Sequence, residues 1–308
     1  MTSVPPPNFQ HPGSPPPRPE LPDGVVASAP PPSYLPPADS PRTGLAAVPG
    51  WAPLAAMVAA FVIATIAYLI IGAGIAAGGG KVSADGPPGL VISATLIQDL
   101  ALVVAALVFA SFWARGLTPA SFGLRLTPFW KAVGWMALAF AGFWVLTLLY
   151  LSIVGEPQQQ ELTRDLKDEE SLSALIAYGT LLALAAPLAE EFFFRGFMFG
   201  VLSKRIGPVW GGLATGLVFG LVHAAGSPLK TVVVLIILGI VLCMLFWKTG
   251  SLLPCIAVHS INNSISFGAT KSLEPLAFAA VVLGSVAICM TVATAVVRRG
   301  QLTSTASG

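Results

Sequence analysis

The sequence has few charged residues and few cysteines. Only 10% of its 308 residues are Asp, Glu, Lys or Arg, against about 25% in soluble domains, whereas 55% are hydrophobic. This composition excludes an ordinary soluble domain and predicts an integral membrane protein. A net charge of +2, with no Lys or Arg run longer than two residues, also predicts that nucleic acid is not a partner. The three cysteines have no CxxC spacing, which favours neither a disulfide framework nor a thiolate metal site.

Residues 1–50 differ from the rest of the chain because they hold 16 of the 27 prolines and almost no long apolar side chains. Such a composition predicts a disordered, polyproline-like cytoplasmic tail. A solvated tether is the favoured interpretation, and a ligand for an aromatic-lined groove on a partner protein is the alternative. The tail lacks the basic start and apolar core of a secretory signal, so we expect the first hydrophobic helix to direct targeting.

Hydrophobic runs long enough to cross a bilayer as helices follow the tail. There are eight, at about 52–77, 90–113, 129–153, 173–201, 208–226, 230–247, 251–268 and 275–297. They predict an all-α, polytopic membrane bundle over residues 51–300, followed by a short polar tail at 301–308. With the amino terminus inside, ten of the sixteen Lys and Arg residues fall in inner segments. This asymmetry predicts a multi-pass protein of the cell membrane with both termini cytoplasmic.

Ionisable residues within these spans are costly to bury in a bilayer and are therefore candidates for function. They are Asp99, Glu190, Glu191, Arg195, His223 and His259. Glu191 and Arg195 are four residues apart, which predicts an ion pair on one helix face and leaves Glu190 as the freer carboxylate. Glu190 and His223 each lie about 16 residues from a turn near residue 206, so two antiparallel helices would bring them to the same depth. His259 and Asn263 share a face of the seventh span at a comparable depth.

Two histidines, a carboxylate and an amide in one bundle predict the activation of a water molecule for hydrolysis. In one route Glu190, His223 and His259 are the three ligands of a catalytic zinc ion that keeps one open position. In the other route Glu190 and His223 activate the water without a metal, while His259 and Asn263 bind the oxyanion of a tetrahedral intermediate. Both routes lead to cleavage of a peptide bond.

Two further features of the spans have structural interpretations. Asp99 has no evident partner in the sequence, and a structural hydrogen bond is favoured over a second-shell role or a proton route. Gly216 and Gly220 are small residues four apart, which predicts close packing of the fifth span against another helix.

The polar residues occur in three motifs of fixed order. They are Glu190-Glu191-Phe192-Phe193-Phe194-Arg195, Phe219-x-x-x-His223 and His259-x-x-x-Asn263. This order resembles the signature of the CPBP family, the CAAX-protease and bacteriocin-processing intramembrane endopeptidases, also called Abi proteins. The motif core spans 173–268, and the stretch 115–125 is similar to the interfacial segment of bacterial members.

The resemblance assigns a role to each motif residue. It implies that Glu190 and His223 activate water, that His259 and Asn263 bind the oxyanion, and that Glu191 and Arg195 support the site. Family members are commonly called metalloproteases, for which zinc is the expected metal, although a metal-free glutamate-dependent mechanism has also been argued. Eukaryotic members remove the terminal tripeptide of prenylated CAAX proteins, and bacterial relatives are linked to peptide processing and bacteriocin self-immunity.

The sequence thus predicts an intramembrane endopeptidase that cleaves a membrane-associated protein or peptide. A non-catalytic membrane scaffold or bacteriocin self-immunity protein is one alternative. A proton-coupled transporter is the other, but residues 52–153 and 173–297 show no internal repeat of the kind common in transporters.

Overall fold

The computed structural model describes residues 44–80, 88–155, 166 and 169–305, and these ranges contain helices and no strand. The longer α-helices are α1 (Ala52–Ala77), α2 (Pro88–Trp113), α3 (Phe129–Val154), α7 (Gly200–Leu221), α8 (Leu229–Thr249), α9 (Leu252–Thr270) and α10 (Pro275–Thr305). The shorter elements are η1 (Gly44–Ala46), η2 (Pro119–Phe122), α5 (Leu172–Thr180), η3 (Leu181–Ala185), α6 (Ala186–Glu191) and η4 (Phe192–Phe199), of which η3 and η4 are π-helical. The predicted all-α class is confirmed. The predicted tail lies, up to residue 43, outside the described residues.

Six helical stretches in the described ranges are long and apolar enough to cross a membrane. One of them, Leu172–Leu221, has 50 residues and would be about 75 Å long if it were straight, far more than a bilayer needs. It is broken at Gly207, whose φ of 82° is open to glycine, and Pro208 follows. Counting this stretch twice and adding α9, which His259 and two asparagines make less apolar, accounts for the eight predicted spans.

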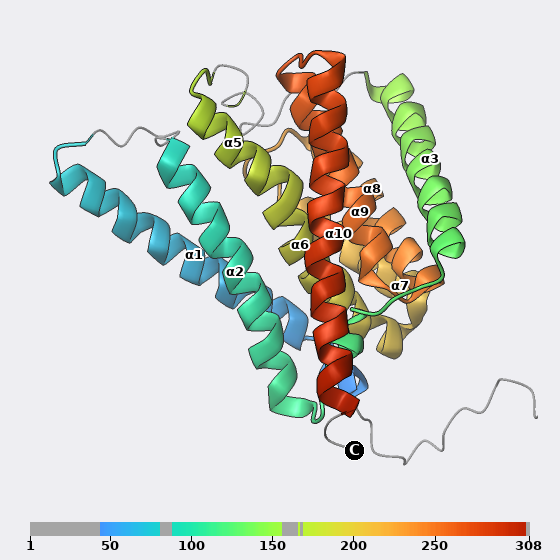
Figure 1. Ribbon diagram of the computed structural model, residues 1–308. Helices are drawn as coiled ribbons and strands as arrows, with labels where there is room; N and C mark the ends of the chain where they lie inside the picture. Colours follow the sequence, from blue (N-terminus) through green and yellow to red (C-terminus); the bar gives the residue numbers. More distant parts are fainter. Residues whose placement is uncertain (1–43, 81–87, 156–165, 167–168, 306–308) are drawn as a thin grey trace, which may run out of the picture. The chain divides into compact units, whose positions relative to one another are not determined.

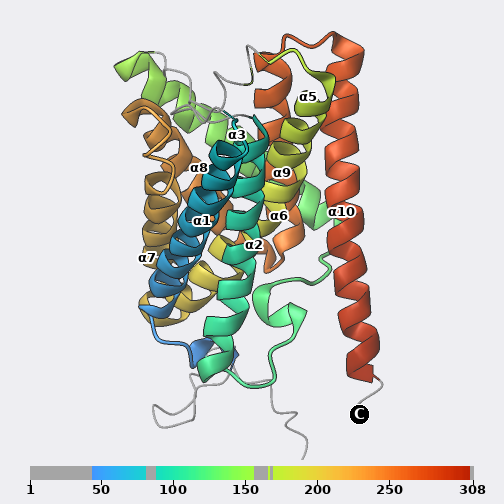
Figure 2. The ribbon, with the colours of Figure 1, turned by 90° about the vertical axis from the view of Figure 1, so that its left-hand side faces the viewer.

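The helices pack largely in pairs (Figures 1 and 2). Close contacts join α1 to α2, α7 to α8, and α9 to α10, while α3 packs on α8. The irregular run from α5 through η4 contacts both α2 and α9. This run carries the first motif, so the motif is surrounded by helices from both sides of the sequence.

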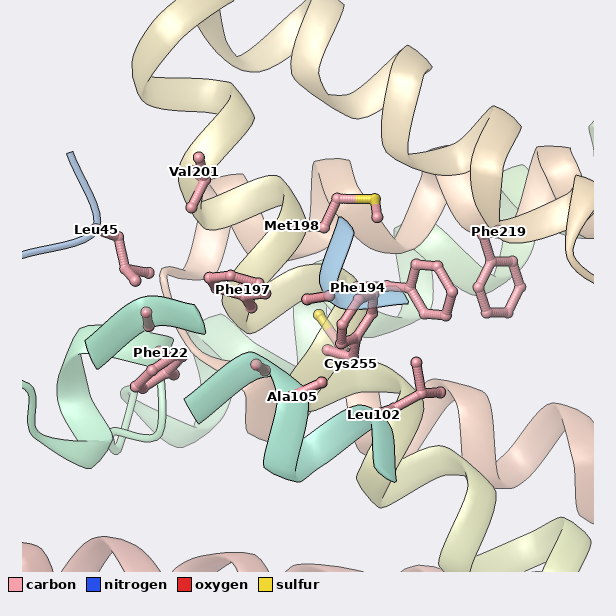
Figure 3. Packing of buried hydrophobic residues seen from close by; sticks show 14 of the residues in the cluster. Leu45, Leu102, Ala105, Phe122, Phe194, Phe197, Met198, Val201, Phe219 and Cys255 are labelled. Atoms are coloured by element: carbon pink, nitrogen blue, oxygen red, sulfur yellow. The ribbon is translucent and has the colours of Figure 1, made fainter. Parts of the chain in front are cut away.

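Aromatic side chains fill the interior around the first motif (Figure 3). Phe193, Phe194 and Phe197 of η4 are fully buried together with Phe219 of α7. The rings of Phe194 and Phe219 meet edge to face with centroids 5.1 Å apart. The four large rings pack η4 against α7 through van der Waals and edge-to-face contacts, which join helices in a membrane because lipid chains are as apolar as the side chains themselves.

The segment between α2 and α3 is tied to the turn between α8 and α9. The Ser251 hydroxyl donates to the Arg125 carbonyl at 2.6 Å, and the Leu252 amide donates to the Gly123 carbonyl at 2.8 Å. The Arg125 side chain also donates to the Gly250 carbonyl. These contacts hold η2 at the end of the bundle, between α2 and α10 (Figure 2).

Glycines allow α7 and α8 to approach closely. A Cβ atom on Gly216 would lie 2.7 Å from the Ile240 amide nitrogen, and one on Gly220 would lie 2.8 Å from the Val232 carbonyl oxygen. The facing residue on α8 is Gly239, where a Cβ atom would lie 2.8 Å from the Gly216 Cα atom. The predicted close packing at Gly216 and Gly220 is therefore confirmed.

Candidate active site

A proline shapes the helix that carries the two motif glutamates. Pro187 of α6 has no N–H group, so it can close neither an α-helical bond to Ala183 nor a π-helical bond to Leu182. Side chains of α9 replace the missing donor at both carbonyls. The Ser260 hydroxyl donates to the Ala183 carbonyl at 2.7 Å, and the Asn263 amide donates to the Leu182 carbonyl at 2.9 Å. These two bonds dock α9 onto the glutamate helix, where freed backbone groups would otherwise face hydrocarbon.

Glu191 and Arg195 form a completely buried ion pair. Arg195 Nη1 donates to Glu191 Oε1 at 2.7 Å, as their spacing predicts, and neither side chain is exposed. Arg195 Nη2 donates to the Gly239 carbonyl on α8 at 3.2 Å, and the guanidinium lies over the ring of Phe219 at 4.5 Å. Arg195 thus connects the glutamate helix to both α7 and α8.

His259 lies between the two motif glutamates. Its Nδ1 is 2.8 Å from Glu191 Oε1, and its Nε2 is 3.9 Å from Glu190 Oε2. The first contact is a hydrogen bond that orients the imidazole, whereas the second is too long for a direct one. Glu190 is 15% exposed and Glu191 is not exposed at all. Glu190 is therefore the carboxylate that a reactant can reach.

His223 lies just beyond the end of its helix. We predicted a span over 208–226, but α7 ends at Leu221, ahead of a turn that leads to Pro228. His223 Nδ1 is 2.7 Å from the Phe219 carbonyl, and because a carbonyl only accepts, Nδ1 carries the hydrogen and Nε2 has a free lone pair. No hydrogen bond or ion pair joins His223 to Glu190 in the part of the chain described here. The two histidines instead flank the ring of Phe219, with centroid distances of 5.1 Å for His223 and 5.9 Å for His259.

Asn263 has only part of its hydrogen-bonding capacity engaged. One amide hydrogen is given to the Leu182 carbonyl, and the Asn263 Oδ1 atom accepts from the Asn262 amide at 3.4 Å. A primary amide carries two hydrogens, so one remains for a further acceptor. The oxyanion role predicted for Asn263 requires only that second hydrogen.

The three candidate zinc ligands do not form a metal site in this arrangement. Among the described residues, no three His, Cys, Asp or Glu side chains are grouped closely enough to hold a metal ion. Glu191 and the Phe219 carbonyl engage the Nδ1 atoms of His259 and His223, so each ring could offer only its Nε2 atom to a metal ion. In the described residues, Glu190, His223 and His259 do not form a group that could hold a zinc ion.

Asp99 is placed near the site by α2 but does not make the structural hydrogen bond that we expected. Its side chain is only 4% exposed, yet its Oδ2 atom has no hydrogen-bond partner within the described ranges.

Ser260 is the site residue whose role sequence reasoning did not find. The sequence did contain a signal for this role, which is the proline inside a predicted helix. Such a proline frees carbonyls three to five residues earlier, and these carbonyls need hydrogen-bond donors from a neighbouring helix.

The comparison with known families agrees with the geometry. Residues 172–265 match the family model described as type II CAAX prenyl endopeptidase Rce1-like. This segment is similar to the CAAX-protease family domain. The match begins at the first residue of α5 and ends within α9, so the family domain contains all three motifs. No curated protein and no solved structure matches the chain.

This similarity supports, at the family level, the function of an intramembrane endopeptidase. The apolar spans and the family domain together describe a multi-pass membrane protein.

Proposed function

We propose that this protein hydrolyses a peptide bond in a membrane-associated protein or peptide, using a water molecule activated by Glu190. The observation that carries the proposal is the buried chain of contacts from Arg195 through Glu191 to His259, which leaves Glu190 as the accessible carboxylate. Such a chain fixes one imidazole and one base in a low-dielectric interior, which is the arrangement that general base catalysis needs.

In the proposed reaction Glu190 accepts a proton from water, and the water oxygen bonds to the carbonyl carbon of the substrate. His223 orients the water through the free lone pair on its Nε2 atom. The oxyanion receives hydrogen bonds from the remaining amide hydrogen of Asn263 and from Nε2 of His259 in its protonated form, in which both ring nitrogens carry hydrogen. Glu190 then returns the proton to the amide nitrogen as the C–N bond breaks, so that atoms and charge balance. No step uses a metal, because the three candidate ligands do not form a set that fits one.

We also propose that the lipid bilayer surrounds the site and that both termini lie on the cytoplasmic side. The excess of Lys and Arg in the predicted inner segments supports that orientation. A partner for the proline-rich residues 1–50 remains a prediction from composition alone.

The decisive experiment compares new protein amino termini in membranes from cells that express the wild type or Glu190→Gln. The substitution is nearly isosteric but removes the base, so we expect cleavage to fall by about 10²–10⁴-fold with little change in expression. Glu274→Gln is the matched control, since Glu274 is an exposed carboxylate outside the site. Identical termini in wild type and Glu190→Gln, at equal expression, would contradict proteolysis and favour a scaffold or immunity protein.

A further inference from the structure

An apolar cavity of about 630 Å³ lies between α2 and α10, next to the glutamate helix. Its walls come from α2, the η2 segment, the run from η3 to η4, α9 and α10. We call it the α2–α10 cavity. Ala189, the residue before Glu190, lies on its wall, so the cavity reaches the site. Almost all of its lining is aliphatic or aromatic, and among the described residues that line it Asp99 alone is charged.

Asp99 is unusual because none of the helices that pack on α2 offers it a positive charge. Asp99 Oδ2 is buried and has no hydrogen-bond partner among the described residues. The helix α1 contains no charged residue, and α5 contains only Tyr178 as a titratable group. The adjoining α6 contributes Glu190 and Glu191, of which Glu190 is close enough to repel Asp99, and Arg195 of η4 is already paired with Glu191. A buried carboxylate without a partner is costly, so the missing partner is expected from whatever fills the cavity.

We propose that the α2–α10 cavity binds the substrate as an extended apolar peptide segment, and that Asp99 pairs with a Lys or Arg side chain of that segment. This inference rests on the proposed function and specifies its substrate class. A lipid chain would suit the apolar walls but carries no donor for Asp99, whereas a basic side chain supplies both an apolar stem and a positive charge.

The dimensions of the cavity place the basic residue close to the scissile bond. Along α2 the lining runs from Leu96 through Asp99 to Leu107, which is about 16 Å at the helical rise. An extended peptide of about five residues covers this length. The lining ends at Thr118 and Pro119 on one side, and Asp99 lies toward the other, beside the helix that holds Glu190. The basic residue is therefore expected within one or two positions of the bond that is cut.

The test measures peptide binding separately from cleavage. Fluorescent apolar peptides of about ten residues, identical except for Lys or Met at one central position, are titrated into the purified full chain in detergent. The protein carries Glu190→Gln, so that no peptide is consumed. We expect the Lys peptide to bind at least about tenfold more tightly than the Met peptide, in line with a charge-assisted contact. Adding Asp99→Asn should remove this preference, whereas adding Glu274→Gln, on an exposed carboxylate, should keep it.

Equal binding of the two peptides, or a preference that Asp99→Asn leaves unchanged, would overturn the inference. Labelling of the cavity by a photoactivatable fatty acid, with neither peptide competing, would also overturn it and make the cavity a lipid site. Because the ratio of two affinities is compared within each variant, a partial loss of folded protein does not alter the result. Cleavage by the wild type is then measured separately, so failure of proteolysis and failure of this inference are distinguishable.

Discussion

Arg195 is a fully buried charged residue whose contacts reach three helices. It pairs with Glu191, donates to the carbonyl of Gly239 and lies over the ring of Phe219. Glu191 in turn holds His259. Removing one member of a fully buried pair leaves the other charge without compensation, which costs far more than the pair contributes in total. Arg195 is therefore expected to matter first for folding and only through folding for catalysis.

We predict that Arg195→Met destabilises the protein by about 3–5 kcal/mol, because Glu191 is left buried and charged. Thermal unfolding in detergent measures the change, with Arg298→Met as control, since Arg298 is exposed on α10. Adding Glu191→Gln to Arg195→Met should recover part of the loss, because the amide oxygen still accepts from His259 while the stranded charge is gone. A double variant as unstable as Arg195→Met alone would argue against a charge-pair origin.

At the scale of elements, the closeness of α7 and α8 sets the position of the site. Gly216 and Gly239 touch backbone to backbone, and the carbonyl of Gly239 is an acceptor for Arg195. Any displacement of α8 therefore moves a hydrogen bond of the buried ion pair. The sequence pattern of Gly216 and Gly220 predicted the close packing, but it could not show that the partner glycine also serves Arg195.

Gly216→Ala should destabilise the protein by about 1–3 kcal/mol, since its new methyl group would meet the backbone of α8. Gly134→Ala in α3 is the matched control, because a methyl group there has nothing within 4 Å and Ala is the better helix former. Unfolding temperatures of the two variants in the same detergent make the comparison. Equal stability of Gly216→Ala and the wild type would mean that the two helices can separate at little cost.

At the scale of the whole molecule, the relative positions of Glu190, His223 and His259 bear on whether the protein requires a metal ion. The three candidate ligands come from three separate segments, and the described residues contain no group of three His, Cys, Asp or Glu side chains that could hold a metal ion. Bringing Glu190, His223 and His259 together around one ion would require at least one of these segments to move.

We therefore predict that activity survives dialysis of the purified protein against a strong chelator, and that elemental analysis finds much less than one zinc ion per chain. Unfolding temperature before and after dialysis serves as a second readout, because a resident metal would stabilise the folded state by mass action. One zinc per chain, lost together with activity and restored by added zinc, would contradict the metal-free mechanism.

How far the sequence predicted this molecule depends on the kind of interaction. The membrane-spanning helices followed from hydrophobic length, although six stretches rather than eight meet that criterion among the described residues. The ion pair of Glu191 with Arg195 followed from helical spacing, because it is a local property of one helix. The contacts between helices were harder to predict from the sequence. Equal depth assumed a helix that continues through His223, whereas α7 ends at Leu221, and the described residues show no hydrogen bond or ion pair between His223 and Glu190. The open oxygen of Asp99 was also not predictable, because it depends on what the neighbouring helices lack.

The bonds from Ser260 and Asn263 to the carbonyls freed by Pro187 have a consequence for biogenesis. α9 is not among the described stretches apolar enough to cross a membrane by themselves, and its Ser260 and Asn263 find their acceptors 77 and 81 residues earlier in the chain. The ribosome therefore delivers the acceptors before the donors. We expect α9 to enter the bilayer as a segment that an already inserted helix retains, so that membrane integration and assembly of the candidate active site are the same event.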